Sequence, residues 1–234
     1  MEFTLKAFLH QKLNFIRNLY DISTEPFTSR MQKIAEHEAP YDEYHGDPEC
    51  AEDPFQDDWL DAYSSVETLG ACCLCLVHDA LKQFMAEFFR STGRTSPTGT
   101  GTWVERYSPF LLAEYQIDLK AAPGDLNILE QLALARNDLQ HCGELQVNHI
   151  WQNAKHQRKI PQSIFVQDVG MPRNKMAIQR DSLFQAIEFV RGLGNFLVDN
   201  TKEPFNITYE SPFDAFEQLD DEAARALLEK ELSE

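Results

Sequence analysis

Apolar residues recur every three or four positions along several long stretches of the chain, which is the period of a helix that buries one face. Residues 3–20 follow this pattern and are predicted to form an amphipathic helix. A short helix is expected to begin at Pro26, because proline suits the first turn of a helix. The next residues, 38–58, are rich in Pro, Asp, Glu and Gly, so we expect an exposed acidic loop there.

The strongest helical pattern covers residues 58–90. Its apolar positions are Trp59, Tyr63, Val66, Leu69, Cys73, Val77, Ala80, Phe84 and Phe88. The middle of this stretch, Leu69–Val77, is apolar on nearly all sides. A helix of this kind either lies at the centre of a bundle or faces a partner on its second side.

The second half of the chain contains three more helical patterns. Residues 91–102 predict a flexible connection. A helix is predicted from about Trp103 to Lys120 with an interruption near Pro109, and another runs from near Asp125 to Gly143, a suitable C-cap. The buried positions of the second are Ile128, Leu132, Ala135 and Leu139.

Residues 144–180 lack a clear period, although 163–167 could form a short strand. Asp181 or Ser182 is a suitable N-cap for a helix that continues to about Val198. One further acidic helix is predicted after Pro212. These elements predict an all-α protein.

The expected domain organisation is one helical domain at 1–200, with its core at about 58–200, and an acidic C-terminal extension at 201–234. The formal net charge is −17, which favours solubility and opposes non-specific binding to nucleic acid. Between 145 and 180 the balance reverses, and this segment is a candidate to follow a phosphate backbone. Asp168 is the only acidic residue of this segment. Its basic residues are Lys155, Arg158, Lys159, Arg173, Lys175 and Arg180.

The cysteines indicate a reducing compartment. They are Cys50, Cys72, Cys73, Cys75 and Cys142. An odd count, with three of them inside one apolar helical stretch, is typical of a cytoplasmic protein without disulfides. The N-terminus has no signal-type apolar core and no apolar run approaches about 18 residues, so no membrane span is predicted.

The residues best suited to chemistry are Arg136, Asn137 and His141, at the end of the helix that begins near Asp125. Here the sequence resembles the HEPN (higher eukaryotes and prokaryotes nucleotide-binding) family. The signature of that family is an Arg, then a polar residue, often Asn, and a His after four to six intervening residues. The resemblance covers roughly residues 58–200, where the predicted helices fit the family's bundle of four to five helices.

The resemblance implies a HEPN-like bundle with N- and C-terminal helical extensions that cleaves RNA without a metal or another cofactor. It also implies a homodimer, because two subunits of this family bring both motifs into one cleft. A cytoplasmic toxin or antiviral defence component is the implied setting, with an antitoxin or another regulatory protein as a possible partner. Some family toxins have a Tyr, two residues after the His, that the antitoxin modifies. Gly143 stands there, which puts that route of control in doubt.

These residue types suit attack by a ribose 2′-hydroxyl on its own phosphate. His accepts or donates a proton near neutral pH, and the planar guanidinium of Arg matches phosphate oxygens. Asn137 can orient a neighbouring group without titrating. Lys155, Arg158 and Lys159 are the candidates to contact RNA outside the reacting centre, and a solvated surface is the alternative for each of them.

Two other interpretations remain open. A lone Arg and His at a helix end often serve only as a C-cap interaction with exposed carbonyls. The net charge of −17 favours a non-catalytic scaffold that binds a basic partner or mimics nucleic acid.

Weaker patterns are interpreted as structural. Cys72 and Cys75 have a CxxC spacing without a second pair, so core packing is favoured over a metal site. His78 and Asp79 are adjacent on the 58–90 helix, where one is expected to be packed and the other solvated. Lys82 on the same helix could approach a cleft.

Overall fold

The computed structural model describes residues 4–42, 54–142, 166–167 and 176–202. Within these residues the protein is helical apart from one short pair of antiparallel strands, so the predicted all-α class is confirmed. The elements are α1 (Leu5–Ala35), α2 (Gln56–Ser91), α3 (Trp103–Tyr115), the 3-10 helix η1 (Leu119–Ala121), α4 (Asn127–Cys142), β1 (Val166–Gln167), β2 (Met176–Ala177) and α7 (Arg180–Asn200).

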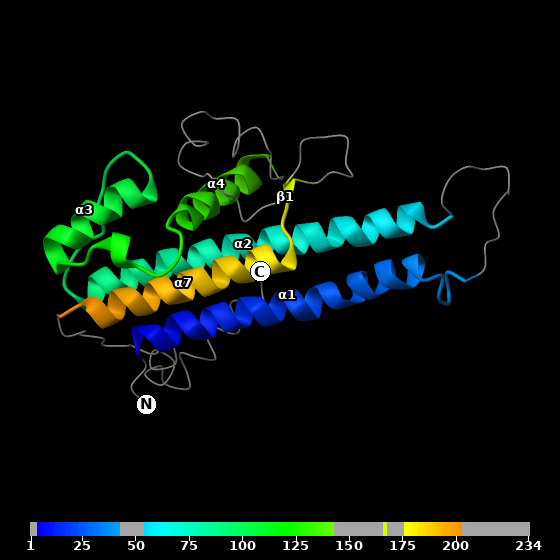
Figure 1. Ribbon diagram of the computed structural model, residues 1–234, viewed down its shortest axis with the longest axis horizontal. Coiled ribbons are helices and arrows are strands. Elements are labelled where there is room, and N and C mark those ends of the chain that lie inside the picture. Colours follow the sequence, from blue (N-terminus) through cyan, green and yellow to red (C-terminus); the bar gives the residue numbers. More distant parts are fainter. Residues whose placement is uncertain (1–3, 43–53, 143–165, 168–175, 203–234) are drawn as a thin grey trace, which may run out of the picture.

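The long helices α1, α2 and α7 lie side by side along the long axis of the molecule (Figure 1). α1 runs antiparallel to both of the others, and its contact with α2 is the most extensive in the described chain. α4 packs on α2 and touches α7, while α3 packs against α4. Helix α2 therefore has neighbours on three sides, as expected for the central helix of a bundle.

One hydrophobic core joins these helices. Its largest fully buried side chains are Leu9, Leu13, Leu74, Phe84, Met85, Phe88, Phe89, Leu111, Leu119, Leu129 and Leu132. Burial of one such side chain contributes about 1.5–3 kcal/mol to folding. Helix α1 contributes to this core from its first turn, at Leu5.

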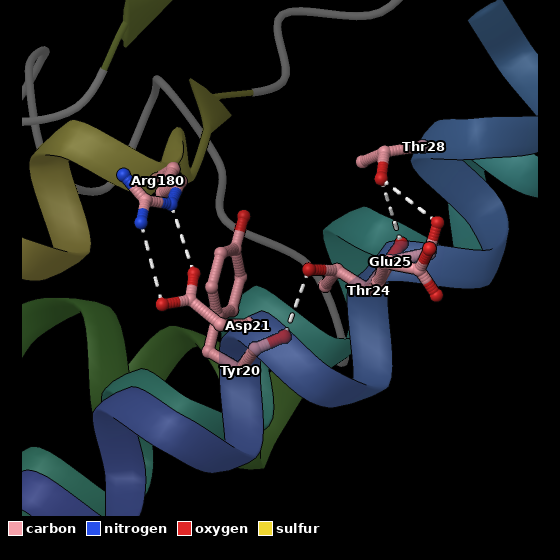
Figure 2. Close-up of polar contacts among 6 residues, drawn as sticks. All are labelled: Tyr20, Asp21, Thr24, Glu25, Thr28 and Arg180. Atoms are coloured by element: carbon pink, nitrogen blue, oxygen red, sulfur yellow. Dashed lines mark hydrogen bonds and ion pairs between the residues drawn. The ribbon is translucent and has the colours of Figure 1, made fainter.

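Polar pairs fix the register of α1 against α7. They are Lys6 with Asp199, His10 with Asn195, Asn14 with Arg191, Arg17 with Glu188, and Asp21 with Arg180. The last is bidentate, with Arg180 Nε 2.9 Å from Asp21 Oδ1 and Nη2 3.3 Å from Oδ2 (Figure 2). A paired geometry of this kind orders both side chains more strongly than a single contact does.

The prediction of two separate N-terminal helices is wrong, because α1 continues through Pro26. Proline removes one helical hydrogen bond, and the hydroxyl groups on either side bond to the backbone of the same turns. Thr24 Oγ1 donates to the Tyr20 carbonyl at 2.8 Å, and Thr28 Oγ1 donates to the Glu25 carbonyl at 3.0 Å (Figure 2). Ile34 is buried in the last turn, so packing on α2 extends past the proline.

The predicted boundaries of α3 and α4 also change. α3 is not interrupted at Pro109, and it ends at Tyr115 rather than near Lys120 because Gln116 adopts a left-handed conformation with φ of 59°. A capping box between Thr102 and Glu105 begins the helix. α4 begins at Asn127, two residues later than expected.

At the other end of the chain, α7 begins at Arg180 with Gln179 as its N-cap, and neither Asp181 nor Ser182 serves as the cap. The ion pair of Arg180 with Asp21 holds this first turn on α1. β1 covers the last two residues of the predicted 163–167 strand. The remainder of that strand, the helix after Pro212 and the 203–234 part of the predicted extension lie outside the described residues.

The place of α1 in the core can be tested by truncating one buried side chain. Leu9 is fully buried, so Leu9→Ala should lower the free energy of unfolding by about 2–5 kcal/mol. Ile22 on the same helix is 75% exposed, and Ile22→Ala should change it by less than about 0.5 kcal/mol. Urea unfolding measures both. Equal, small effects would mean that α1 is an appendage.

Candidate functional site

Arg136 lies at the edge of the contact between α4 and α2. The residues before it on α4, Leu129, Leu132 and Ala135, are buried in the core, and the chain then presents Arg136 half-buried at the surface of that core. α4 is itself held by α3, because the buried Glu130 accepts a hydrogen bond from the backbone N–H of Val104 at 3.2 Å. The position of Arg136 is thus set by packing on one side and by this polar contact on the other.

The guanidinium of Arg136 is only partly satisfied. Nη1 donates to Oδ1 of the exposed Asn137 at 3.3 Å. Nε is buried and has no hydrogen-bond partner among the described residues. A buried donor without a partner is unfavourable by about 1–3 kcal/mol.

α2, on which α4 packs, carries a polar stripe. It consists of Cys75, His78 and Lys82, which are three or four positions apart, and of Asp79, which is adjacent to His78. His78 Nδ1 lies 3.4 Å from Asp79 Oδ1, and the His78 side chain is 21% exposed while that of Asp79 is 48% exposed. We call these four residues, together with Arg136, the α2–α4 cluster.

The charge of Arg136 lowers the pKa of two members of this stripe, His78 and Cys75. Burial lowers the pKa of His78 from its ordinary value; Arg136 and Lys82 lower it further, and the hydrogen bond and charge of Asp79 oppose the change. Burial raises the pKa of the Cys75 thiol, and Arg136 opposes that rise. The cluster therefore combines a guanidinium, a largely neutral imidazole and a carboxylate.

The lowered pKa of His78 has a consequence for stability. The pKa of His78 is lower in the folded protein than in the unfolded chain. At a pH between these two pKa values, the unfolded chain binds a proton at His78 while the folded protein does not. The contribution of His78 to stability is therefore fully present above the ordinary pKa of histidine. It is lost as the pH falls from there through the folded-state value.

The structure describes only part of the predicted site. Arg136 and Asn137 lie on α4, and the backbone of residue 141 belongs to the same helix, which extends to Cys142. The side chain of His141 lies outside the described residues, as do Gly143 and the proposed RNA contacts Lys155, Arg158 and Lys159. His78 and Asp79, interpreted from sequence as structural, lie on α2, the helix on which α4 packs, and the charge of Arg136 lowers the pKa of His78.

The cysteines of α2 have different surroundings. Cys73 is buried, which raises the pKa of its thiol to about 11, so it is unreactive at neutral pH. Cys72 is exposed and Cys75 is half-buried. Within the described ranges, no group of three or more His, Cys, Asp or Glu side chains could hold a metal ion.

An open groove lies next to the α2–α4 cluster, between α1 and α2. It has a volume of about 520 Å³, and its lining includes Phe8, Phe15, Ile16, Leu76 and Asp79. Phe15 is 62% exposed and Leu76 is 39% exposed, so apolar surface borders the groove. Asp79 belongs to both features, which places the groove beside the cluster.

Helix α2 is long and apolar enough to cross a membrane by length and composition, and 28% of its most apolar window is buried. A core helix of a soluble protein passes the same test. The expectation that no segment spans a membrane therefore stays a prediction.

Comparison of the chain with protein-family models, with curated proteins and with solved structures finds no match.

Proposed function

We propose that the protein is a metal-independent endoribonuclease of HEPN type that works as a homodimer in the cytoplasm, as a toxin or an antiviral defence component. The proposed substrate is RNA, and the proposed site is built from Arg136, Asn137 and His141. Lys155, Arg158 and Lys159 are proposed to contact the RNA backbone beyond it. An antitoxin or another regulatory protein would control the activity.

The observation that carries this proposal is the state of Arg136. The residue is half-buried, its Nε has no partner among the described residues, and its charge lowers the pKa of His78 on α2. An arginine placed only to cap a helix would direct its donors at the last carbonyls of that helix. The one donor of Arg136 with a described partner, Nη1, instead bonds the Asn137 side chain, and a guanidinium with donors to spare suits a phosphate.

The proposed reaction is an internal transesterification. The ribose 2′-oxygen loses its proton to an imidazole and forms a bond to phosphorus, while the bond from phosphorus to the 5′-oxygen breaks. The departing 5′-oxygen takes a proton from a second imidazole, proposed to be His141, so that the products are a 2′,3′-cyclic phosphate and a 5′-hydroxyl. Arg136 would stabilise the negative charge that develops on the phosphorane oxygens.

The groove between α1 and α2 supports the homodimer. Phe15 and Leu76 expose apolar side chains at its border, and such surface marks interaction sites more often than isolated residues do. Because Asp79 lines the groove, a second copy seated there in a two-fold arrangement would place its own cluster near this one. The pairing would bring two Arg136 side chains to one RNA.

The net charge of −17 is the observation that favours the alternative, a non-catalytic acidic scaffold. A scaffold would not need a guanidinium whose buried Nε has no partner among the described residues. An assay of RNA cleavage distinguishes the two proposals, because only the ribonuclease would cut RNA.

Removal of either motif residue should abolish most of the activity. His141→Ala should lower the cleavage rate by about 10²–10⁴-fold, as expected for a lost acid or base, and Arg136→Ala should lower it comparably. Arg136→Lys should not restore it, because an ammonium cannot form the planar bidentate contact. The measurement is cleavage of mixed RNAs in excess chelator, with detection of 2′,3′-cyclic phosphate ends.

Arg17→Ala is the control, since it removes an exposed arginine of α1 without touching the cluster. Circular dichroism establishes that each variant is folded. If folded wild-type protein cuts no RNA and does not arrest growth when expressed, the scaffold proposal replaces this one. If His141→Ala cuts as fast as wild type, His141 is not in the site.

The dimer can be disrupted at the groove. Light scattering of the wild type should give twice 26.9 kDa, and Leu76→Glu should give 26.9 kDa, because a carboxylate would have to be buried at the interface. Leu112→Glu is the matched control, since Leu112 is 54% exposed on α3 and away from the groove. A wild-type monomer that is fully active at micromolar concentration would contradict the dimer.

A further inference from the structure

Helix α1 has a second apolar side besides the one that it buries in the core. Its buried side chains include Leu5, Leu9, Leu13, Ile16 and Tyr20. On the second side, residues four and three positions apart form an outer stripe with the heptad spacing of a coiled coil. The outer stripe of α1 consists of Phe8, Lys12, Phe15, Leu19 and Ile22. Phe15 is 62% exposed and Ile22 is 75% exposed, so the described helices leave much of this stripe uncovered.

Helix α2 carries an outer stripe with the same spacing. It consists of Leu69, Cys72, Leu76, Asp79 and Gln83, none of which is buried. Members of both stripes line the groove from opposite walls, and because α1 and α2 are antiparallel the two stripes match in reverse order. The pairs at equal heights along the helices are Phe8 with Gln83, Lys12 with Asp79, Phe15 with Leu76, Leu19 with Cys72 and Ile22 with Leu69. The two stripes thus form one face, roughly 21 Å long at the rise of an α-helix.

Each outer stripe contains one charged residue, and these two residues lie at the same height. Lys12 Nζ is 5.0 Å from the centroid of the Phe8 ring, and no ion pair of Lys12 is found among the described residues. The Asp79 side chain is 48% exposed, and its contact with the His78 ring is long, at 3.4 Å. A single charge in an apolar stripe determines which helix can pack on it, because an uncompensated or like charge opposite it is unfavourable.

Resting on the homodimer of the proposed function, we infer that α1 of each subunit packs on α2 of the other, with Lys12 of each paired to Asp79 of the partner subunit. The two-fold axis then runs along the helices. Phe15 of each subunit meets Leu76 of the partner subunit in the same arrangement. Because Asp79 also belongs to the α2–α4 cluster, each subunit contributes a cation to the cluster of the other.

The charges select this arrangement over the other two-fold packing of the same face. With the axis across the helices, α1 would lie on α1 of the partner subunit, and Lys12 could meet only members of its own stripe. That stripe contains no carboxylate, so Lys12 would face an apolar side chain or a second lysine. With the axis along the helices, every Lys12 meets an Asp79, and the face is complementary to itself in charge as well as in apolar surface.

The inference is tested by reversing one charge at a time and then mixing the variants. In Lys12→Glu the new carboxylate meets Asp79, and in Asp79→Lys the new ammonium meets Lys12, so each variant has two repulsive pairs per dimer. The dissociation constant of each should rise by at least about tenfold at low salt. An equimolar mixture of the two variants should form dimers again, because both contacts of a mixed dimer join opposite charges. Sedimentation velocity over a concentration series measures all four samples, wild type included.

Lys33→Glu is the matched control. It makes the same change of charge in the last turn of α1, outside the outer stripe, and should leave the association unchanged. Circular dichroism establishes that each variant is folded. Mixing also separates a pair between subunits from a pair within one subunit, since only the former is restored when the two variants meet.

The outcomes distinguish this inference from the proposed function. If Leu76→Glu is monomeric but both charge variants associate like wild type, the groove binds a second copy and the inferred pairing fails. If the charge variants are weakened and their mixture is not restored, Lys12 and Asp79 act within one subunit and the inference also fails. A wild-type monomer at micromolar concentration would assign the face to another occupant, such as a partner helix or a lipid surface, and would overturn both the homodimer and the pairing. If the mixture dimerises and wild type cuts no RNA, the pairing stands and the ribonuclease proposal fails.

Discussion

Everything in this molecule depends on how the apolar surface of α2 is covered. Three helices pack on it: α1 along most of its length, α7 beside α1, and α4 across its middle. Gly70 on α2 allows close approach, since a Cβ there would lie 3.3 Å from the Ile178 carbonyl just before α7. The covered surface of α2 has two edges, one where α2 meets α4 and one where α2 meets α1. The α2–α4 cluster lies at the first, and the apolar groove at the second.

The charges at the edge between α2 and α4 matter for the proposed chemistry. The protein is strongly acidic as a whole, yet at His78 two positive charges act, those of Arg136 and Lys82. Burial, together with these charges, lowers the pKa of His78, while the carboxylate of Asp79 accepts a hydrogen bond from its ring. Local arrangement, rather than net charge, therefore governs what this surface can bind.

Sequence alone was sufficient wherever apolar periodicity was long. The all-helical class and the helix that carries Arg136 were predicted from spacing, because a buried face repeats at the helical period whatever the tertiary context. For α2 the spacing left two alternatives open, a central place in a bundle or a partner on its second side. Local signals failed where packing overrode them: α1 passes through Pro26, and α7 begins at Arg180 because Asp21 holds its first turn. His78 could not be assigned to Arg136 from sequence, because 58 positions separate them and only the packing of α4 on α2 joins them. A polar stripe at helical spacing, from Cys75 to Lys82 on an apolar helix, was the one signal available.

The central claim is that Arg136 and His78 share one site, and the most direct measurement is the titration of the His78 imidazole by NMR. In wild type its pKa should lie below the ordinary value for histidine, because of burial and the nearby positive charges. In Arg136→Met the pKa of His78 should rise, since one of those charges is gone, whereas Arg17→Met should leave it unchanged. An identical His78 pKa in wild type and Arg136→Met would contradict the claim that these two residues form one site.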